Sequence, residues 1–121
     1  MIDHYLDRES GVLVVRPTGP LSEADFRTLT DVVDPYILET GPLRGLVVHT
    51  EKFPGWEDLF GMIGHLRFVR DHYRHIRRIA LVSDSKLAGL VPRIGEHFLS
   101  AELKVYSYRE LDAATEWVNK G

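Results

Sequence analysis

Cysteine is absent from this chain of 121 residues. Its absence excludes a disulfide scaffold, a thiolate zinc site, an iron–sulfur cluster and a thiol nucleophile, although histidine and carboxylate groups can still hold a metal. A chain of this length buries roughly two thirds of its unfolded surface, so one hydrophobic core can stabilise it without covalent cross-links. We therefore expect a single domain over residues 1–121.

Long apolar runs and catalytic motifs are also lacking. The first 20 residues carry several charges and no long apolar stretch, so we expect neither a signal peptide nor an integral membrane association, and we predict a cytoplasmic protein. The sequence contains no Gly-x-Ser-x-Gly elbow, no Walker loop and no dinucleotide-binding glycine pattern. We therefore predict a protein that is not an enzyme and has no catalytic residue and no cofactor.

The charges that are present are unevenly placed. The formal net charge is −3, which argues against a protein that coats nucleic acid. Residues 1–60 hold 11 acidic and five basic side chains, whereas residues 61–83 hold five arginines and a single acid, Asp71. This asymmetry predicts either a local anion site or a charge-complementary contact between subunits.

The spacing of apolar residues predicts the order ββαβαβαβα. The predicted strands cover 2–6, 12–15, 45–48, 79–82 and 104–106, and the predicted helices cover 26–37, 56–73, 87–99 and 111–118. Helical crossovers require parallel pairing of the strands that they connect and place helices against the sheet. We therefore expect a small α/β domain with a mixed sheet of about five strands.

Two kinds of local signal refine the predicted helices. Ser22 stands three residues before Asp25, so its hydroxyl can cap the first free amides of a helix. Proline lacks an amide proton, so we expect Pro35 to kink or restart the first helix and Pro92 to distort the third.

The chain from Gly55 onward carries motifs of a known family. They are Gly55-Trp56 at the start of the long helix, the Arg-Ile-Ala-Leu-Val-Ser-Asp segment at 78–84, Tyr106, and the Ala-Ala-Thr-Glu-Trp-Val segment at 113–118. Together with the order of elements, they resemble the SpoIIAA-like family of STAS-fold proteins over nearly the whole chain. The resemblance implies a bacterial STAS fold, often discussed beside CRAL-TRIO lipid-binding domains, with no established enzymatic activity.

The sequence departs from the parent STAS group at one place. Anti-sigma-factor antagonists of that group carry an Asp-Ser-Ser or similar phosphoacceptor at the start of the helix after the central strand. The corresponding stretch here, residues 50–56, contains no serine, and its single hydroxyl belongs to Thr50. This implies that a kinase-controlled switch is lost or altered. Asp84-Ser85 follows the next strand instead, so we interpret Ser85 as a helix cap.

The long predicted helix and the residue just after it supply the candidate ligand-binding residues. They are the apolar Trp56, Phe60, Ile63 and Phe68 and the basic Arg67, Arg70 and Arg74. The arginines recur at intervals of three and four residues and so share a helical face. That face can hold a phosphate, a lipid headgroup, an acidic partner or a second subunit. It can equally be a solvated face whose arginines pair with nearby acids, and the apolar residues can be ordinary core.

The orientation of this helix is a separate question. If Trp56 and Phe60 face the sheet, the helical period turns Phe68 away, and we expect it to be more exposed. Gly61 and Gly64 weaken helix propensity and permit close packing or bending. His72 and His75 have the spacing to share a metal, but no zinc motif accompanies them, so we predict no metal site.

Two non-enzymatic functions remain open from the sequence, beside a third interpretation as a hydrolase or transferase whose histidine and carboxylate groups converge in a cleft. In the first, the protein binds or senses an apolar or amphiphilic small molecule such as a lipid, with the long helix covering an apolar pocket and its arginines beside an anionic headgroup. In the alternative, it is a STAS-type interaction or regulatory module that works without the phosphoacceptor serine, through another protein or as a homodimer. In that case the same residues form an interface.

Overall fold

A five-stranded mixed sheet forms the centre of the structure. The computed structural model describes residues 1–85 and 100–121, so the helix expected over 87–99, with Pro92, lies outside the described residues. The strands are β1 (Ile2–Asp7), β2 (Val12–Pro17), β3 (Leu43–His49), β4 (Ile76–Val82) and β5 (Glu102–Tyr106). They lie in the order β1-β2-β3-β4-β5, with β1 antiparallel to β2 and all other pairs parallel. The predicted mixed α/β sheet of five strands is confirmed.

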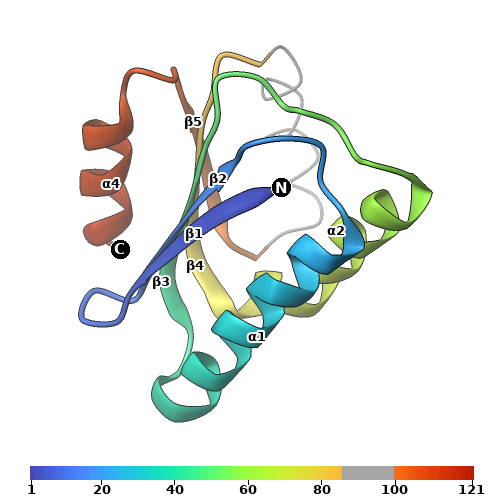
Figure 1. Ribbon diagram of the computed structural model, residues 1–121. Coiled ribbons are helices and arrows are strands. Elements are labelled where there is room, and N and C mark those ends of the chain that lie inside the picture. The colour runs from blue at the N-terminus through green and yellow to red at the C-terminus, as the bar shows by residue number, and fades with distance from the viewer. Residues whose placement is uncertain (86–99) are drawn as a thin grey trace.

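Helices cover both faces of this sheet. The described helices are α1 (Glu23–Thr40), α2 (Leu59–His72), the short 3₁₀ helix η1 (Tyr73–His75) and α4 (Leu111–Asn119). Helices α1 and α2 lie on one face and α4 lies on the other (Figure 1). The core is accordingly divided into two clusters of buried side chains, one on each face of the sheet. None of the helices within 1–85 and 100–121 is long and apolar enough to cross a membrane.

Helix α1 begins as its sequence predicts. The Ser22 hydroxyl accepts a hydrogen bond from the Asp25 amide at 3.2 Å, and the Asp25 carboxylate accepts one from the Ser22 amide at 2.8 Å. This reciprocal pair is a capping box. The predicted restart at Pro35 is wrong, because α1 continues through it. Val33 and Tyr36 on either side of the proline are both buried in the core, and this packing keeps the segment helical.

Helix α4 packs directly on the middle of the sheet. Its Ala114 and Val118 are fully buried, as are Val47 of β3 and Ala80 of β4 beneath them. A Cβ atom at Gly45 would lie 1.9 Å from the Val118 Cγ1 atom. Helix α4 can therefore pack this closely on the sheet only because residue 45 has no side chain.

Candidate binding surface on helix α2

Helix α2 begins later than the apolar spacing predicts. The Asp58 carboxylate caps it by accepting a hydrogen bond from the Gly61 amide at 3.0 Å. Trp56 precedes the helix and forms an isolated parallel bridge with Leu21. Trp56 is thus placed by the loop that leads into α2 and not by the helix itself.

Two glycines bring α2 close to the start of α1. A Cβ atom at Gly61 would lie 2.3 Å from the Leu21 carbonyl oxygen, which is far inside contact distance. At Gly64 it would lie 3.4 Å from the Glu23 Cα, an ordinary contact. Close packing through these glycines, one of the two roles that the sequence suggested, is confirmed.

The inward face of α2 carries the glycines together with Phe68 and His72. Phe68 is 8% exposed and stacks on the His72 ring with centroids 4.3 Å apart. His72 Nε2 lies 2.8 Å from a carboxylate oxygen of Asp34 on α1, and Nδ1 lies 2.8 Å from the Phe68 carbonyl oxygen. The two helices are therefore joined by a buried imidazole. Phe68 was expected to be the more exposed aromatic if Trp56 and Phe60 faced the sheet. That premise is wrong, because Trp56 and Phe60 are exposed and Phe68 is the aromatic that points inward.

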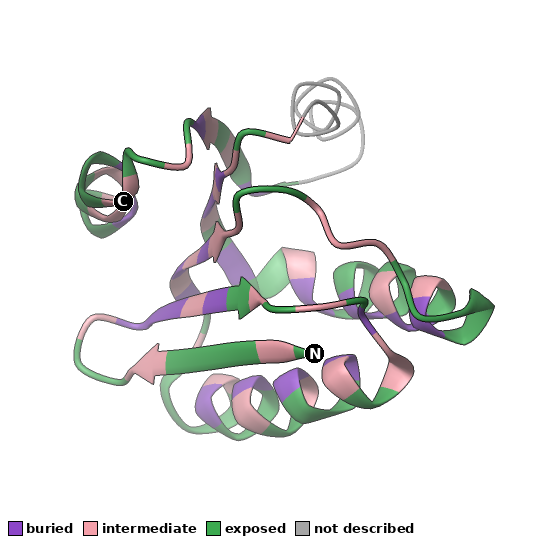
Figure 2. Ribbon diagram, turned by 45° about the horizontal axis from the view of Figure 1, so that its top comes forward, coloured by how far each residue is buried: buried purple, intermediate pink, exposed green. Residues whose placement is uncertain are grey.

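The opposite face of α2 is apolar and exposed to solvent. The members of this α2 outer face are Leu59, Phe60 and Leu66, each 62% exposed, and Ile63 and Val69, each 37% exposed. Figure 2 shows exposed residues along the side of α2 that is turned away from α1. Isolated exposed apolar residues are normal on protein surfaces, but five on one short helix form a continuous patch of the kind that marks an interaction site.

Trp56 lies at the edge of this surface and is held by a histidine. It is 40% exposed, and its indole N–H donates to His65 Nδ1 at 3.2 Å. The His65 ring stacks on Phe26 of α1 with centroids 4.8 Å apart. Burial lowers the pKa of His65 below its ordinary value of 6.5, which favours the neutral ring that can accept this hydrogen bond.

The three predicted arginines are all exposed and lie toward the end of α2 or just after it. Arg70 pairs with Asp71 at 2.9 Å, and its guanidinium lowers the pKa of that carboxyl group. Arg74 on η1 donates to the Tyr73 hydroxyl at 3.2 Å. Within the described part of the chain, no carboxylate lies within ion-pair distance of Arg67. The beginning of α2 is instead acidic, with exposed Glu57 and Asp58.

Six of the seven predicted site residues are exposed on α2 or directly beside its ends. Phe60, Ile63, Arg67 and Arg70 project from α2, Trp56 lies beside its start and Arg74 follows its end. Phe68 lies in the core instead.

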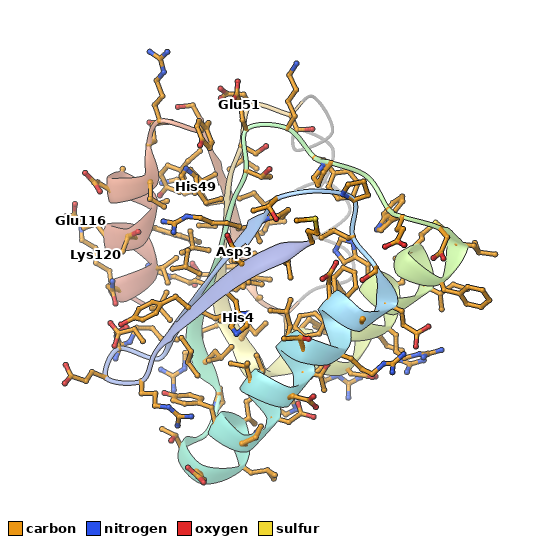
Figure 3. All side chains as sticks on the ribbon, in the orientation of Figure 1. Asp3, His4, His49, Glu51, Glu116 and Lys120 are labelled. Carbon is orange, nitrogen blue, oxygen red and sulfur yellow. The ribbon has the colours of Figure 1, made fainter. Side chains whose placement is uncertain are left out.

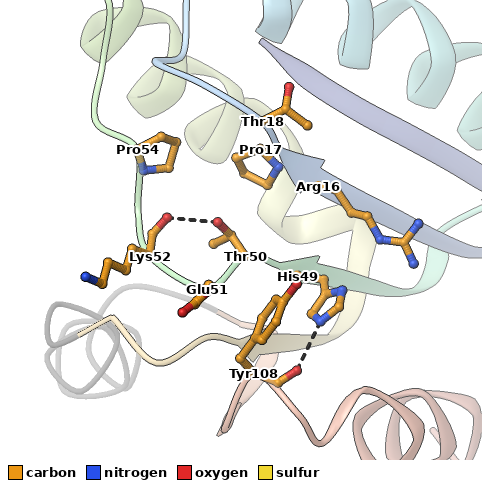
Figure 4. A pocket seen from close by; sticks show the side chains of 9 residues that line it. All are labelled: Arg16, Pro17, Thr18, His49, Thr50, Glu51, Lys52, Pro54 and Tyr108. Carbon is orange, nitrogen blue, oxygen red and sulfur yellow. Dashed lines mark hydrogen bonds between the residues drawn. The ribbon is translucent and has the colours of Figure 1, made fainter.

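A cavity lined by both polar and apolar groups lies elsewhere, at the carboxyl ends of β2 and β3. Its volume is about 370 Å³, and Figure 4 shows its lining. His49 Nε2 lies 3.1 Å from the Tyr108 carbonyl oxygen, and the two rings stack 4.5 Å apart. The Thr50 hydroxyl donates to the Lys52 carbonyl oxygen at 2.9 Å. None of the predicted site residues lines this cavity. The position just after parallel strands is the sequence signal that could have located it.

Other charged groups of the structure form ordinary surface pairs. The Lys120 ammonium, just after α4, lies 3.3 Å from the Glu116 carboxylate on α4, on the opposite face of the sheet from α2 (Figure 3).

In residues 1–85 and 100–121, no three histidine or carboxylate groups gather in a way that could hold a metal ion. His72 is engaged with Asp34, and His75 is exposed on η1.

Comparisons with known proteins agree with this architecture. A crystal structure of an uncharacterised protein of the DUF3478 family with a SpoIIAA-like fold, from Shewanella loihica PV-4, superposes with a TM-score of 0.71 at 16% identity, covering 97% of this chain and 93% of that chain. No curated protein matches the sequence significantly. The SpoIIAA-like family model matches residues 12–119. The chain therefore belongs to the SpoIIAA-like family.

Proposed function

We propose that this protein is a non-enzymatic binding module that holds an amphiphile on the α2 outer face. The observation that carries the proposal is the apolar patch of α2 beside a cluster of exposed arginines. Leu59, Ile63 and Leu66 supply the surface for an acyl chain or other apolar part, whereas Arg67 and Arg70 lie where an anionic headgroup would sit. Amphipathic helices with this division of side chains bind lipid interfaces through apolar area and electrostatic attraction.

The close packing of α2 favours binding on this surface over binding beneath it. Gly61 holds the helix against the Leu21 backbone, and Phe68 fills the space toward the sheet. An apolar chain under α2 would have to displace both contacts. Leucine and phenylalanine side chains on the outer face are already in water, so covering them stabilises a complex by about 25 cal/mol per Å² of apolar area.

Vesicle co-sedimentation tests this proposal. We expect the protein to sediment with vesicles that contain an anionic phospholipid and more weakly with purely zwitterionic vesicles. Leu66→Glu should weaken binding at least about tenfold, because it places a charge where a buried leucine contributes roughly 1.5–3 kcal/mol. Leu38→Glu is the matched control, because Leu38 is 87% exposed on α1 and lies outside the α2 outer face.

The arginines are tested separately on the same vesicles. Each basic residue near an anionic surface contributes on the order of 1 kcal/mol, so the double change Arg67→Ala and Arg70→Ala should weaken binding about tenfold or more at low salt and less at high salt. Equal binding by wild type and Leu66→Glu, or no binding to any vesicle and no retained amphiphile in native mass spectrometry, would overturn the proposal.

A protein partner is the second candidate, and one observation favours it. The α2 outer face has acids at its start, Glu57 and Asp58, and arginines toward its end. A uniformly anionic bilayer attracts only one of these ends, whereas a protein surface of complementary pattern attracts both. Photo-crosslinking in the native host distinguishes a protein partner from an amphiphile. A photoreactive amino acid is placed at position 66 and, as a control, at position 38. Protein adducts that form only from position 66 support the protein partner, and the absence of such adducts argues against it.

A further inference from the structure

We propose that the α2 outer face is also the contact surface between two copies of this chain, packed with their α2 helices antiparallel about a two-fold axis near Ile63. The inference goes beyond the proposed function, because it assigns a second occupant to the same surface. It arises from the pattern of residues along α2 and from the charges at the two ends of the helix.

The apolar positions have the spacing of a helix pair. Leu59, Ile63 and Leu66 follow one another at intervals of four and three residues, which is the alternation that lines the seam between two packed helices. All three are exposed within one copy, and Ile63 occupies the middle of the series. A two-fold axis at this position places the Ile63 side chains of the two copies against each other. Leu59 of each copy then lies near the end of the contact, just past Leu66 of the other copy.

The end charges select the antiparallel direction. In an antiparallel pair, the acidic start of one α2 (Glu57 and Asp58) lies beside the end of the other, where Arg67 and Arg70 outnumber Asp71. The pairing occurs twice in the dimer because the interface is two-fold symmetric. The helix dipoles are also opposed in this arrangement, whereas a parallel pair would place arginine against arginine.

The size of the contact predicts a reversible dimer. Helix α2 has 14 residues and is about 21 Å long at about 1.5 Å per residue. One helix pair of that length forms a smaller contact than the standard protein interface, so we expect dissociation on dilution. Because an amphiphile and a second copy cover the same side chains, we also expect vesicles to compete with the dimer.

Sedimentation velocity over a concentration series provides the first test. We expect wild type to shift from monomer toward dimer as its concentration rises to the submillimolar range. Leu66→Glu should weaken the dimer at least about tenfold, since it buries a charge at the seam. Leu38→Glu should dimerise like wild type. Both leucines are largely exposed, and circular dichroism confirms that each variant is folded before the comparison is made.

A charge-reversal cycle tests the direction of packing. Glu57→Lys and Arg70→Glu each place like charges together at both ends of an antiparallel pair, so each should weaken the dimer about three- to tenfold. The double variant carries both reversals in every copy and should recover most of the wild-type affinity. Failure of the double variant to recover, after each single change has weakened the dimer, would overturn the antiparallel arrangement.

The outcomes separate this inference from the proposed function. A chain that stays monomeric at every concentration, yet binds vesicles through Leu66, overturns the dimer and leaves amphiphile binding in place. A dimer that tolerates Leu66→Glu uses another surface and also overturns the inference. A dimer that requires Leu66 in a chain that binds no vesicle supports the inference and overturns the amphiphile.

Discussion

Helices α2 and α4 cover opposite faces of the same sheet but treat their apolar residues in opposite ways. Helix α4 buries Ala114 and Val118 against the strands. Helix α2 buries two glycines, a phenylalanine and a histidine, and turns leucine, isoleucine and phenylalanine toward solvent. The difference teaches that a periodic apolar pattern identifies a helix without showing which of its faces points inward. Small residues decide that choice where another backbone lies close.

The largest expected effect comes from the closest contact of α2. Gly61→Ala should lower the free energy of unfolding by about 3 kcal/mol, because its Cβ overpacks a backbone carbonyl that cannot move aside easily. That atom would lie 2.3 Å from the Leu21 oxygen. Gly64→Ala is the control and should be neutral or stabilising by up to about 1 kcal/mol through helix propensity. Urea denaturation measures both, and equal losses would show that the two helices do not depend on the Gly61 contact.

The buried imidazole of α2 gives the next largest effect. His72→Ala should lower the free energy of unfolding by about 2 kcal/mol, because it removes two hydrogen bonds and the stacking on Phe68. The control is His75→Ala on η1, which is exposed and should change stability by no more than about 0.5 kcal/mol. Thermal and urea denaturation provide the comparison. A neutral His72→Ala would mean that the link to Asp34 contributes nothing.

The contact between Val118 of α4 and Gly45 of β3 tests how α4 packs on the sheet. Val118→Ala should lower the free energy of unfolding by about 1.5 kcal/mol, since it leaves a small cavity in a fully buried site. Gly45→Ala introduces a Cβ against the Val118 methyl group and should be less damaging in the Val118→Ala background than in wild type. A double-mutant cycle with a coupling of about 1 kcal/mol is expected. Strict additivity would contradict direct contact.

The smallest effect is a pH dependence at the edge of the α2 outer face. The pKa of His65 is lowered by burial from its ordinary 6.5, so the folded chain binds fewer protons there than the unfolded chain. The neutral ring therefore contributes stability that is present above about pH 6.5 and is lost progressively as pH falls through the folded pKa. Protonation also removes the acceptor of the Trp56 N–H.

Urea denaturation at neutral pH and at about pH 5 measures this loss, and Trp56 fluorescence should change over the same range. His65→Asn places an amide oxygen near the position of Nδ1 without a titrating group. The variant should be less stable overall because the stacking on Phe26 is lost, but its stability should depend less on pH. The same pH dependence in wild type and His65→Asn would rule out His65 as the source.

Local sequence signals predicted much of the fold. The aliphatic segments around Val47 and Ala80 became adjacent parallel strands, and the Ser22 capping box formed as expected. Each of these signals acts within a few residues of the chain. The restart predicted at Pro35 was wrong because packing against the core outweighed a local preference.

The candidate site was predicted less completely. Phe60, Arg67 and Arg70 were correctly assigned to one helix, whereas Arg74 lies on η1. The burial of Phe68 depends on contacts with α1, far away in the sequence. The cavity near His49 and Tyr108 was not anticipated, because the two residues come together only when the ends of separate strands are aligned.

The sequence by itself determined the α/β class, the order of the described elements and the uneven charge of the long helix, because periodicity, capping and composition are local properties. Only the tertiary structure decided that α2 presents its large apolar side chains to solvent. The physical reason is the close approach of two backbones at Gly61 and Leu21. This close approach leaves room only for glycine where α2 meets α1, so the larger residues at positions 59, 60, 63 and 66 point outward.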